Sequence, residues 1–243
     1  MTGQTLFISD LHLDASRPAI TELFLTFLRT AAPQAQALYI LGDLFEAWIG
    51  DDDPAPEHQT VIAALHDLNA QGVALYFMHG NRDFLIGADF AAHSGCTLLA
   101  DPTLIDLYGT PTLLMHGDAL CTDDIDYQKF RRLVRDPHWQ RDFLAKPLAV
   151  RRQIAQAARA ESAAHTAGTA YEIMDANQGA VMTALRTHQV TQLIHGHTHR
   201  PAVHDLDLDG RSARRIVLGD WYEQGSVLRC DADSCTLEGL PLA

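Results

Sequence analysis

Five short segments of the chain combine an Asp, Asn or His with a nearby glycine, and each follows a run of apolar residues. In chain order they read SDLHLD (9–14), GDLFEAW (42–48), GNRDF (80–84), MHGD (115–118) and GHTHRP (196–201). Carboxylate, amide and imidazole groups can bind metal ions, and carboxylates and imidazoles also act as acids or bases. The question is whether these segments belong to one site.

The apolar runs before these segments predict the elements that would position them. Residues 5–9, 37–41, 73–78, 112–115 and 192–194 have the composition of buried strands. In residues 19–31 and 58–72 apolar residues recur every three to four positions, which predicts two helices. Because the carboxyl ends of strands in an open α/β sheet form the ligand crevice, the five segments are expected to converge there.

Each segment taken alone has an ordinary structural explanation. Asp10 and His12 could cap a helix, Asn81 could occupy a left-handed turn, and His116 could be a hydrogen-bonded loop residue. Together these explanations are improbable, since five successive strand ends would have to carry such residues by chance. The combination therefore predicts a functional site.

The last part of the chain differs from the first. Residues 205–221 and 225–240 contain Asp-Gly and Asp-Ala-Asp turn signals between alternating apolar residues, which predicts antiparallel hairpins. The overall prediction is an α/β fold with a mixed sheet, more specifically two packed sheets with helices outside. At 243 residues and 47 % hydrophobic content, the chain is long enough for one such domain, 1–243.

A basic segment interrupts the alternation. Residues 128–160 contain nine of the 18 Lys and Arg residues but only two acids, within a chain of net charge −13. Apolar positions at helical spacing, with a cap and first turn at Asp136 and Pro137, predict a helical insertion over 125–170. Such a segment suits an anion or an anionic membrane surface, while a solvated helix face is the alternative.

Composition excludes some functions. The acidic net charge argues against nucleic acid as a partner, because phosphate backbones are bound mainly by Lys and Arg. Four cysteines without a C-x-x-C pair are too few for a disulfide framework, which favours a reducing compartment. We expect neither a signal peptide nor a transmembrane helix, and no obligate protein partner is evident.

The five segments resemble the motifs of the calcineurin-like metallophosphoesterase superfamily. The resemblance covers nearly the whole chain except the insertion, and it implies a ββ sandwich flanked by helices around two metal ions. It also implies that Asp43 bridges the metals and that Asp43, Arg82 and His116 are catalytic. The remaining metal ligands implied are Asp10, His12 and His199 for one metal, and Asn81, His116 and His197 for the other.

Arg82 departs from the superfamily pattern, in which a histidine usually follows the Gly-Asn and protonates the leaving group. Arginine cannot donate that proton, but it can hold a phosphate through two hydrogen bonds. A phosphate leaving group has a second pKa of about 6 and needs no general acid at neutral pH. Arg82 therefore favours hydrolysis of a pyrophosphate.

The sequence that flanks the motifs is similar to that of one family, the UDP-2,3-diacylglucosamine diphosphatases of lipid A biosynthesis. The segments ALYILGDLFEAWIGDDD, MHGNRDFLIG, HGDALCTDD and IHGHTHRPAVH carry this resemblance. It implies two Mn²⁺ ions, attack of metal-activated water on the α-phosphorus, release of UMP and 2,3-diacylglucosamine 1-phosphate, and a peripheral position on the cytoplasmic face of the bacterial inner membrane. The implied substrate contacts are Asn81, Arg82, Asp124, Ser162, Thr166 and His197.

Three points remain open in the sequence. The resemblance leads us to expect a Lys contact near Thr169, and the residue that replaces it is unidentified. His195 lies outside the G-H-x-H motif, so we expect it to form a supporting hydrogen bond rather than to bind metal. A phosphoesterase of soluble nucleotide polyphosphates and an inactive interaction scaffold are the competing functions; the basic apolar insertion disfavours the first and the full ligand set disfavours the second.

Overall fold

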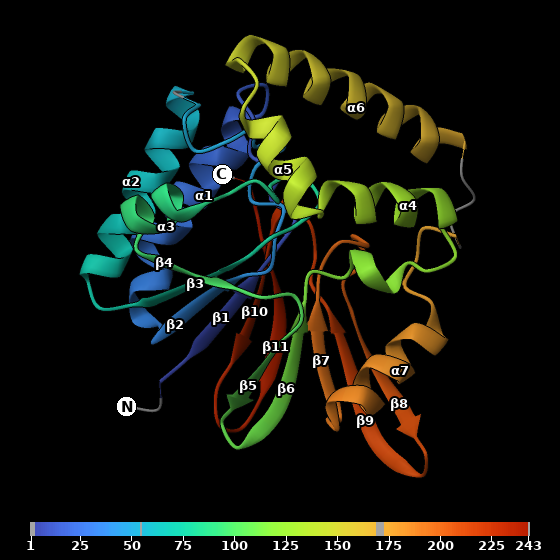
Figure 1. The fold of residues 1–243 in the computed structure, drawn as a ribbon. Coiled ribbons are helices and arrows are strands. Elements are labelled where there is room, and N and C mark those ends of the chain that lie inside the picture. The colour runs from blue at the N-terminus through green and yellow to red at the C-terminus, as the bar shows by residue number, and fades with distance from the viewer. Residues whose placement is uncertain (1–2, 54, 169–172, 243) are drawn as a thin grey trace.

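The computed structural model describes the backbone of residues 3–53, 55–168 and 173–242, without the side chains of 163–168. Within this part, two packed β-sheets form the centre and helices cover their outer faces (Figure 1). The six-stranded sheet has the order β11-β10-β1-β2-β3-β4, and the five-stranded sheet has the order β5-β6-β7-β9-β8. The predicted mixed α/β sandwich is confirmed.

In the first sheet, β1, β2, β3 and β4 are parallel, and the β10–β11 hairpin is added antiparallel to β1. Their bounds are β1 Thr5–Ile8, β2 Ala37–Ile40, β3 Ala74–Met78, β4 Cys96–Leu99, β10 Gly225–Cys230 and β11 Cys235–Leu240. The outer face is covered by α1 (Pro18–Thr30), α2 (Pro56–Ala70) and α3 (Ala88–Ser94). The strands and helices predicted for this half are present within two residues of their expected ends.

The second sheet contains the strand pair β5–β6, then β7, then the β9–β8 hairpin, with β6, β7 and β9 parallel. Its outer face packs against α7 (Gln178–His188) through Val181 and Leu185. The strands are β5 Thr103–Leu107, β6 Thr110–Met115, β7 Gln192–His195, β8 Ala202–Leu208 and β9 Arg211–Val217. Both predicted hairpins, β8–β9 and β10–β11, are confirmed.

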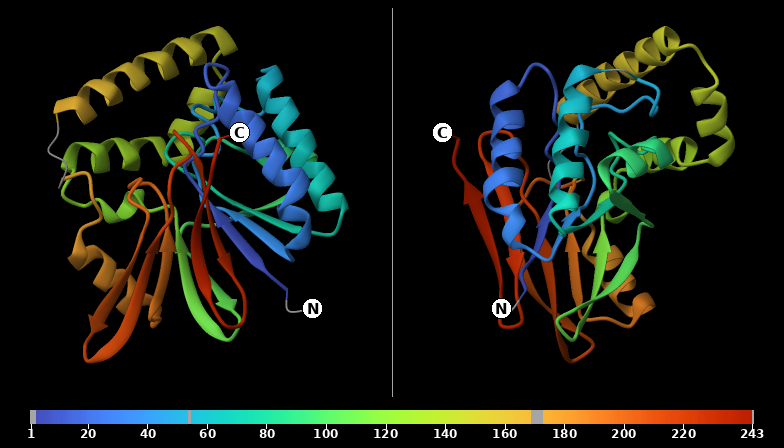
Figure 2. Two further views of the ribbon diagram at one scale, coloured as in Figure 1. Left: turned by 180° about the vertical axis from the view of Figure 1, so that it is seen from behind. Right: turned by 90° about the vertical axis from the view of Figure 1, so that its left-hand side faces the viewer.

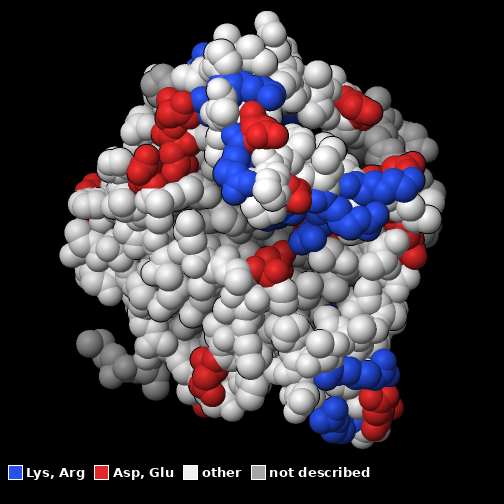
Figure 3. Space-filling view, viewed as in Figure 1, with Lys and Arg blue, Asp and Glu red and all other residues white. Residues whose placement is uncertain are grey.

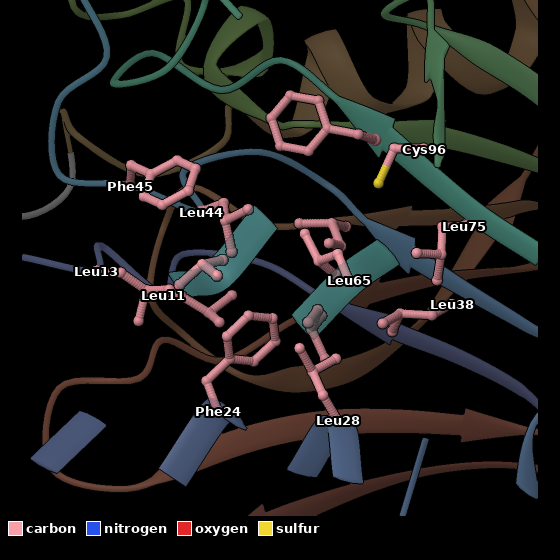
Figure 4. Packing of buried hydrophobic residues seen from close by; sticks show 14 of the residues in the cluster. Leu11, Leu13, Phe24, Leu28, Leu38, Leu44, Phe45, Leu65, Leu75 and Cys96 are labelled. Carbon is pink, nitrogen blue, oxygen red and sulfur yellow. The ribbon is translucent and has the colours of Figure 1, made fainter. Parts of the chain in front are cut away.

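Alternation along the strands places hydrophobic side chains on both faces of each sheet. Leu6 and Ile8 of β1 point toward the helices, whereas Phe7 points between the sheets and packs with Leu114 and Ile194. Figure 4 shows the layer between the first sheet and its helices, where Phe24 of α1 lies among side chains of the loops and of the first sheet. Because both faces of the central strands are buried, the strands read as continuous apolar runs.

The predicted insertion contains three helices, α4 (Ile125–Val134), α5 (Pro137–Leu144) and α6 (Leu148–Gly168), which we call the cap. Residues 169 and 170 of the predicted range lie outside the described residues. The cap lies across the end of the sandwich where the parallel strands terminate, as two views show (Figures 1 and 2). Asp136 caps α5 by accepting hydrogen bonds from the amides of His138 and Trp139, as the Asp-Pro sequence predicts. The structure contains two further short 3₁₀ helices, Ala32–Gln34 and Asp118–Leu120.

A disulfide joins Cys230 and Cys235 across the end of the β10–β11 hairpin. The spacing of the four cysteines does not predict this bond. The two residues are separated by a four-residue turn, but only the antiparallel register places them directly opposite each other. Cys96 and Cys121 are free and buried.

Candidate metal centre and adjoining cavity

The five predicted segments meet at one end of the sandwich, beneath the cap. They follow β1, β2, β3, β6 and β7, at the carboxyl end of each strand. The structure thereby brings together all seven predicted ligands. Two groups have donor atoms within 4.8 Å of one another: Asp10, His12 and His199 in one, and Asp43, His116 and His197 in the other.

Asn81 and Asp43 connect these donors. Asn81 Oδ1 lies 3.1 Å from His116 Nε2 and 2.9 Å from His197 Nδ1, which places it in the second group. Asp43 Oδ2 lies 3.7 Å from His12 Nε2 and 3.8 Å from His116 Nε2. One carboxylate oxygen thus lies between donors of both groups, which is the position a bridging ligand requires.

A buried carboxylate oxygen without a hydrogen bond, together with the charges around it, indicates that cations fit this site. Asp10 Oδ1 is buried and accepts no hydrogen bond within the described part of the chain. Burial lowers the pKa of His116, but Asp43 and Asp118 outweigh it and raise that pKa to about 9. Burial also lowers the pKa of His199, but the carboxylates of Asp10 and Asp220 outweigh it and raise that pKa to about 10. The carboxylates that raise these two pKa values favour divalent cations for the same electrostatic reason. His197 differs, because burial and the charge of His116 lower its pKa to about 4.

The backbone at the ligands adopts the left-handed conformation, which costs non-glycine residues free energy. Eight described non-glycine residues have positive φ, and five of them are predicted ligands. Such strain persists only where the surrounding structure holds it and is typical of functional sites. The five ligands with their φ values are Asp10 (57°), His12 (48°), Asp43 (54°), His197 (68°) and His199 (55°).

Two motif glycines are required by the close approach of these loops. A Cβ at Gly80 would lie 2.1 Å from Asp43 Oδ1, and one at Gly196 would lie 2.4 Å from Asp10 Oδ2. Both distances are far below contact distance, so any side chain would displace a ligand carboxylate. The glycines of GNRD and GHTH therefore permit the convergence that the sequence pattern implied.

The ligand histidines are oriented by partners outside the two groups. His116 Nδ1 donates to the carbonyl of Leu41 (2.8 Å), which leaves its Nε2 facing the site. Glu46 Oε2 lies 3.0 Å from His12 Nδ1, and Asp220 Oδ2 lies 3.3 Å from His199 Nδ1. Hydrogen bonds of this kind set the tautomer and ring orientation of metal-binding histidines.

Sequence reasoning missed Glu46 and Asp220. A signal for each was present, since Glu46 belongs to the same segment as Asp43. Asp220 belongs to a Gly-Asp pair just after a strand, as Asp43 does, within a segment whose turn signals predict only a hairpin.

Replacing Glu46 with Gln should weaken metal binding, because it removes the negative charge that stabilises the His12 Nδ1–H. Loss of such a partner typically costs about ten- to a hundredfold in metal affinity. Titration calorimetry with Mn²⁺ measures the effect directly, with Glu22→Gln on the exposed face of α1 as the matched control. Equal affinities for the two variants would contradict this role.

Asp83 connects two of the ligand loops. Its buried carboxylate accepts hydrogen bonds from the amides of Gly80 (2.8 Å), Leu44 (2.7 Å) and Asp43 (3.3 Å). Burial and the charge of Asp43 raise the pKa of Asp83 to about 7. Asp83 therefore holds the backbone that carries Asp43 and Asn81.

Arg82 lies at the edge of the metal centre. Its amide donates to Asp43 Oδ1 (2.8 Å), and its Nη1 lies 3.8 Å from Glu46 Oε1. The Nε atom is buried without a hydrogen-bond partner in the described part. The guanidinium is therefore tethered on one side and has a donor left for an incoming anion.

His195 is fully buried and lies outside both ligand groups. Its Nδ1 is 2.8 Å from the carbonyl of Gly196, and its Nε2 accepts from Arg215 Nε (2.8 Å). Burial and Arg215 lower its pKa to about 3, so the ring is neutral at ordinary pH. The expected supporting hydrogen bonds are present.

A cavity of about 630 Å³ extends from the metal centre under the cap. Asn81 and Arg82 line it at one end, and Ser162 of α6 also lines it. Most of the wall is apolar and comes from both core and cap: Trp48, Phe84, Phe130, Val134, Trp139, Phe143 and Ile154. The cavity can therefore accept an apolar group attached to a phosphate that lies near Arg82.

The other predicted substrate contacts occupy different positions. Asp124 is the N-cap of α4, where it accepts a hydrogen bond from the amide of Tyr127 (2.9 Å), and it does not line the cavity. Thr166 belongs to α6, but its side chain lies outside the described residues, and Thr169 lies outside them altogether. Their roles in substrate binding stay predictions.

Figure 3 shows Lys and Arg side chains in a band across the face on which α4 lies. Several basic residues of the cap pair with acids outside it. Arg131 Nε donates to Asp118 (2.8 Å), Arg152 donates to Asp53 (2.6 Å), and Arg151, whose side chain is only 3 % exposed, pairs with Asp52. Part of the positive charge thus joins the cap to the core instead of facing solvent.

Comparisons with known proteins agree with this geometry. Residues 3–201 match the calcineurin-like phosphoesterase family model. A UDP-2,3-diacylglucosamine hydrolase of Xanthomonas axonopodis pv. citri (strain 306) is 57 % identical over 98 % of this chain and 99 % of the relative. The protein of the same name from Stenotrophomonas maltophilia (strain R551-3) is 56 % identical over 97 % of this chain and 98 % of the relative.

Solved structures show the same fold at low identity. An archaeal phosphodiesterase superimposes with a TM-score of 0.51 at 12 % identity, covering 98 % of this chain and 99 % of that chain. Vacuolar protein sorting 29 of Cryptosporidium parvum gives a TM-score of 0.51 at 12 % identity, covering 100 % of this chain and 92 % of that chain. No helix in the described part of the chain is long and apolar enough to cross a membrane. The chain is a hydrolase that belongs to the calcineurin-like phosphoesterases and, within them, to the UDP-2,3-diacylglucosamine hydrolase family.

Proposed function

We propose that the protein hydrolyses the pyrophosphate bond of UDP-2,3-diacylglucosamine in lipid A biosynthesis, giving UMP and 2,3-diacylglucosamine 1-phosphate. The observation that carries the proposal is the cavity. Its apolar wall, with Phe130, Trp139 and Phe143, begins beside Asn81 and Arg82 and continues under the cap. A substrate that has acyl chains on one side of a pyrophosphate fits this arrangement, whereas a soluble nucleotide polyphosphate would leave the apolar wall without a partner.

Two Mn²⁺ ions suit the donor set, which mixes carboxylate, amide and imidazole groups. Asp10, His12 and His199 would hold one ion, Asn81, His116 and His197 the other, and Asp43 both. When bound, the pair of cations supplies an activated water and stabilises charge on the phosphoryl oxygens.

The chain's own residues orient the reacting groups. Asp83 fixes the loops of Asp43 and Asn81, and Glu46 and the Leu41 carbonyl fix the rings of His12 and His116. Arg82 binds the leaving phosphate through two hydrogen bonds from its guanidinium group. Because that phosphate is stable as an anion at neutral pH, no residue has to protonate it.

We further infer that the chain is a single metallophosphoesterase domain, 1–243, with the insertion 125–170 as its cap, and that it acts peripherally at the cytoplasmic face of the inner membrane. Exposed apolar side chains on the cap support this, because such residues bind the headgroup boundary of a bilayer together with nearby cations. These side chains are Ile125, Phe130, Leu133, Leu144, Val150 and Ile154.

The experiment is an assay of the purified protein with Mn²⁺ and UDP-2,3-diacylglucosamine in water enriched in ¹⁸O. We expect UMP to be released and to contain the heavy oxygen, since water attacks the α-phosphorus. Heavy oxygen in 2,3-diacylglucosamine 1-phosphate would contradict attack on the α-phosphorus. Faster hydrolysis of a dinucleoside polyphosphate than of the lipid would favour the soluble-nucleotide alternative.

A further inference from the structure

Helix α4 presents one polar stripe to the core. Tyr127, Arg131 and Arg135 are spaced four residues apart, so their side chains lie along one face of the helix. All three extend toward the carboxylate of one residue, Asp118, at the end of β6. The stripe thus joins α4 to the sandwich through polar contacts.

Asp118 is fully buried, and its contacts converge on α4. Its Oδ2 accepts from Tyr127 Oη (2.9 Å) and Arg131 Nε (2.8 Å), and lies 3.7 Å from Arg135 Nη2. Its backbone carbonyl accepts from Gln128 Nε2 (2.8 Å).

The same stripe reaches the metal centre. The Tyr127 ring stacks on the ring of His197, with centroids 5.7 Å apart. Arg135 Nη2 donates to the carbonyl of Gly80 (2.8 Å), the residue before Asn81. Tyr127 also lines the cavity, as do Phe130 and Val134 of the same helix.

We propose that Asp118 is a positioning residue: its buried carboxylate fixes α4 against the sandwich and thereby sets the cavity wall relative to Asn81 and Arg82. An ion pair suits this purpose, because its partners have a defined geometry and because an unpaired buried charge is costly if the helix shifts. The role for substrate binding rests on the proposed function, whereas the attachment of α4 does not.

The test compares Asp118→Asn and Arg131→Gln with Lys129→Gln, which removes an exposed ion pair from the same helix. Two activities are measured with Mn²⁺, on UDP-2,3-diacylglucosamine and on bis(p-nitrophenyl) phosphate, which has no acyl chains. Amide hydrogen exchange over 125–134 is measured on the same proteins. The first two variants should raise KM for the lipid about tenfold, with a smaller change on the aryl ester and faster exchange in α4.

A double variant tests whether Asp118 and Arg131 act together or independently. If Asp118 and Arg131 act together, Asp118→Asn with Arg131→Gln should lose no more than Asp118→Asn alone. Equal losses on both substrates together with faster exchange throughout the sandwich would show a merely structural role and overturn the proposal. Unchanged exchange in α4 would also overturn it, and this readout stands even if the lipid is not hydrolysed.

Discussion

Replacement of Asp43 with alanine should lower turnover of UDP-2,3-diacylglucosamine by about a thousandfold and leave fewer than two Mn²⁺ ions per chain. The reason is the position of Asp43 Oδ2, which is nearly equidistant from His12 Nε2 (3.7 Å) and His116 Nε2 (3.8 Å). Without this oxygen neither group keeps its full set of donors. Metal ions contribute several kcal/mol to stabilising transition-state charge, and about 4 kcal/mol corresponds to a thousandfold in rate.

The measurement pairs UMP release with Mn²⁺ counted by elemental analysis. Asp205→Ala is the matched control, since its side chain is 77 % exposed on β8 and pairs only at the surface with Arg214. Because Asp43 also accepts the amide of Arg82, Asp43→Asn keeps a similar shape and checks that the loss is not due to misfolding. Full turnover with two bound ions in either Asp43 variant would refute the bridging role.

Replacement of Arg82 with alanine should lower kcat/KM on the lipid substrate by about a hundred- to a thousandfold, the usual cost of removing one strong donor to developing charge. The buried Nε of Arg82 has no hydrogen-bond partner among the residues that the structure describes, and the side chain lines the cavity beside Asn81. Arg82→Lys should recover only part of the activity, because an ammonium group cannot hold a phosphate through two parallel hydrogen bonds.

The leaving group makes this prediction specific. If Arg82 stabilises a departing phosphate, the loss should be larger for a pyrophosphate than for an aryl phosphodiester, whose leaving group is a phenolate without phosphoryl oxygens. Steady-state kinetics of the wild type and both variants on the two substrates measure the difference. An equal or larger loss on the aryl phosphodiester than on the pyrophosphate would refute this role of Arg82.

Much of the fold could be predicted because its signals are local. Strands such as Thr5–Ile8 and Ala37–Ile40 are buried on both faces and therefore read as short apolar runs, and the Asp-Gly turn at 209–210 identifies the β8–β9 hairpin. The Cys230–Cys235 disulfide was not predicted, because its partners are opposed only through the pairing of β10 with β11.

The basic segment shows what local signals leave undecided. Composition indicated that 128–160 is positively charged and helical, and it suggested an anionic surface as the partner. The structure adds that Arg131 and Arg151 pair with Asp118 and Asp52, which come from distant parts of the chain. A charge count cannot distinguish a charge that faces solvent from one that pairs across the fold, because the partner depends on tertiary contacts.

The sequence by itself determined which residues follow the strands, and hence that Asp10, Asp43, Asn81, His116 and His197 would meet at one end of a sheet. Only the tertiary structure decided how closely the donors approach, which loops required positive φ, and that Glu46 and Asp220 support the histidines. The physical reason is that strand ends are set by short-range patterns, whereas distances between loops depend on how two sheets and a cap pack together.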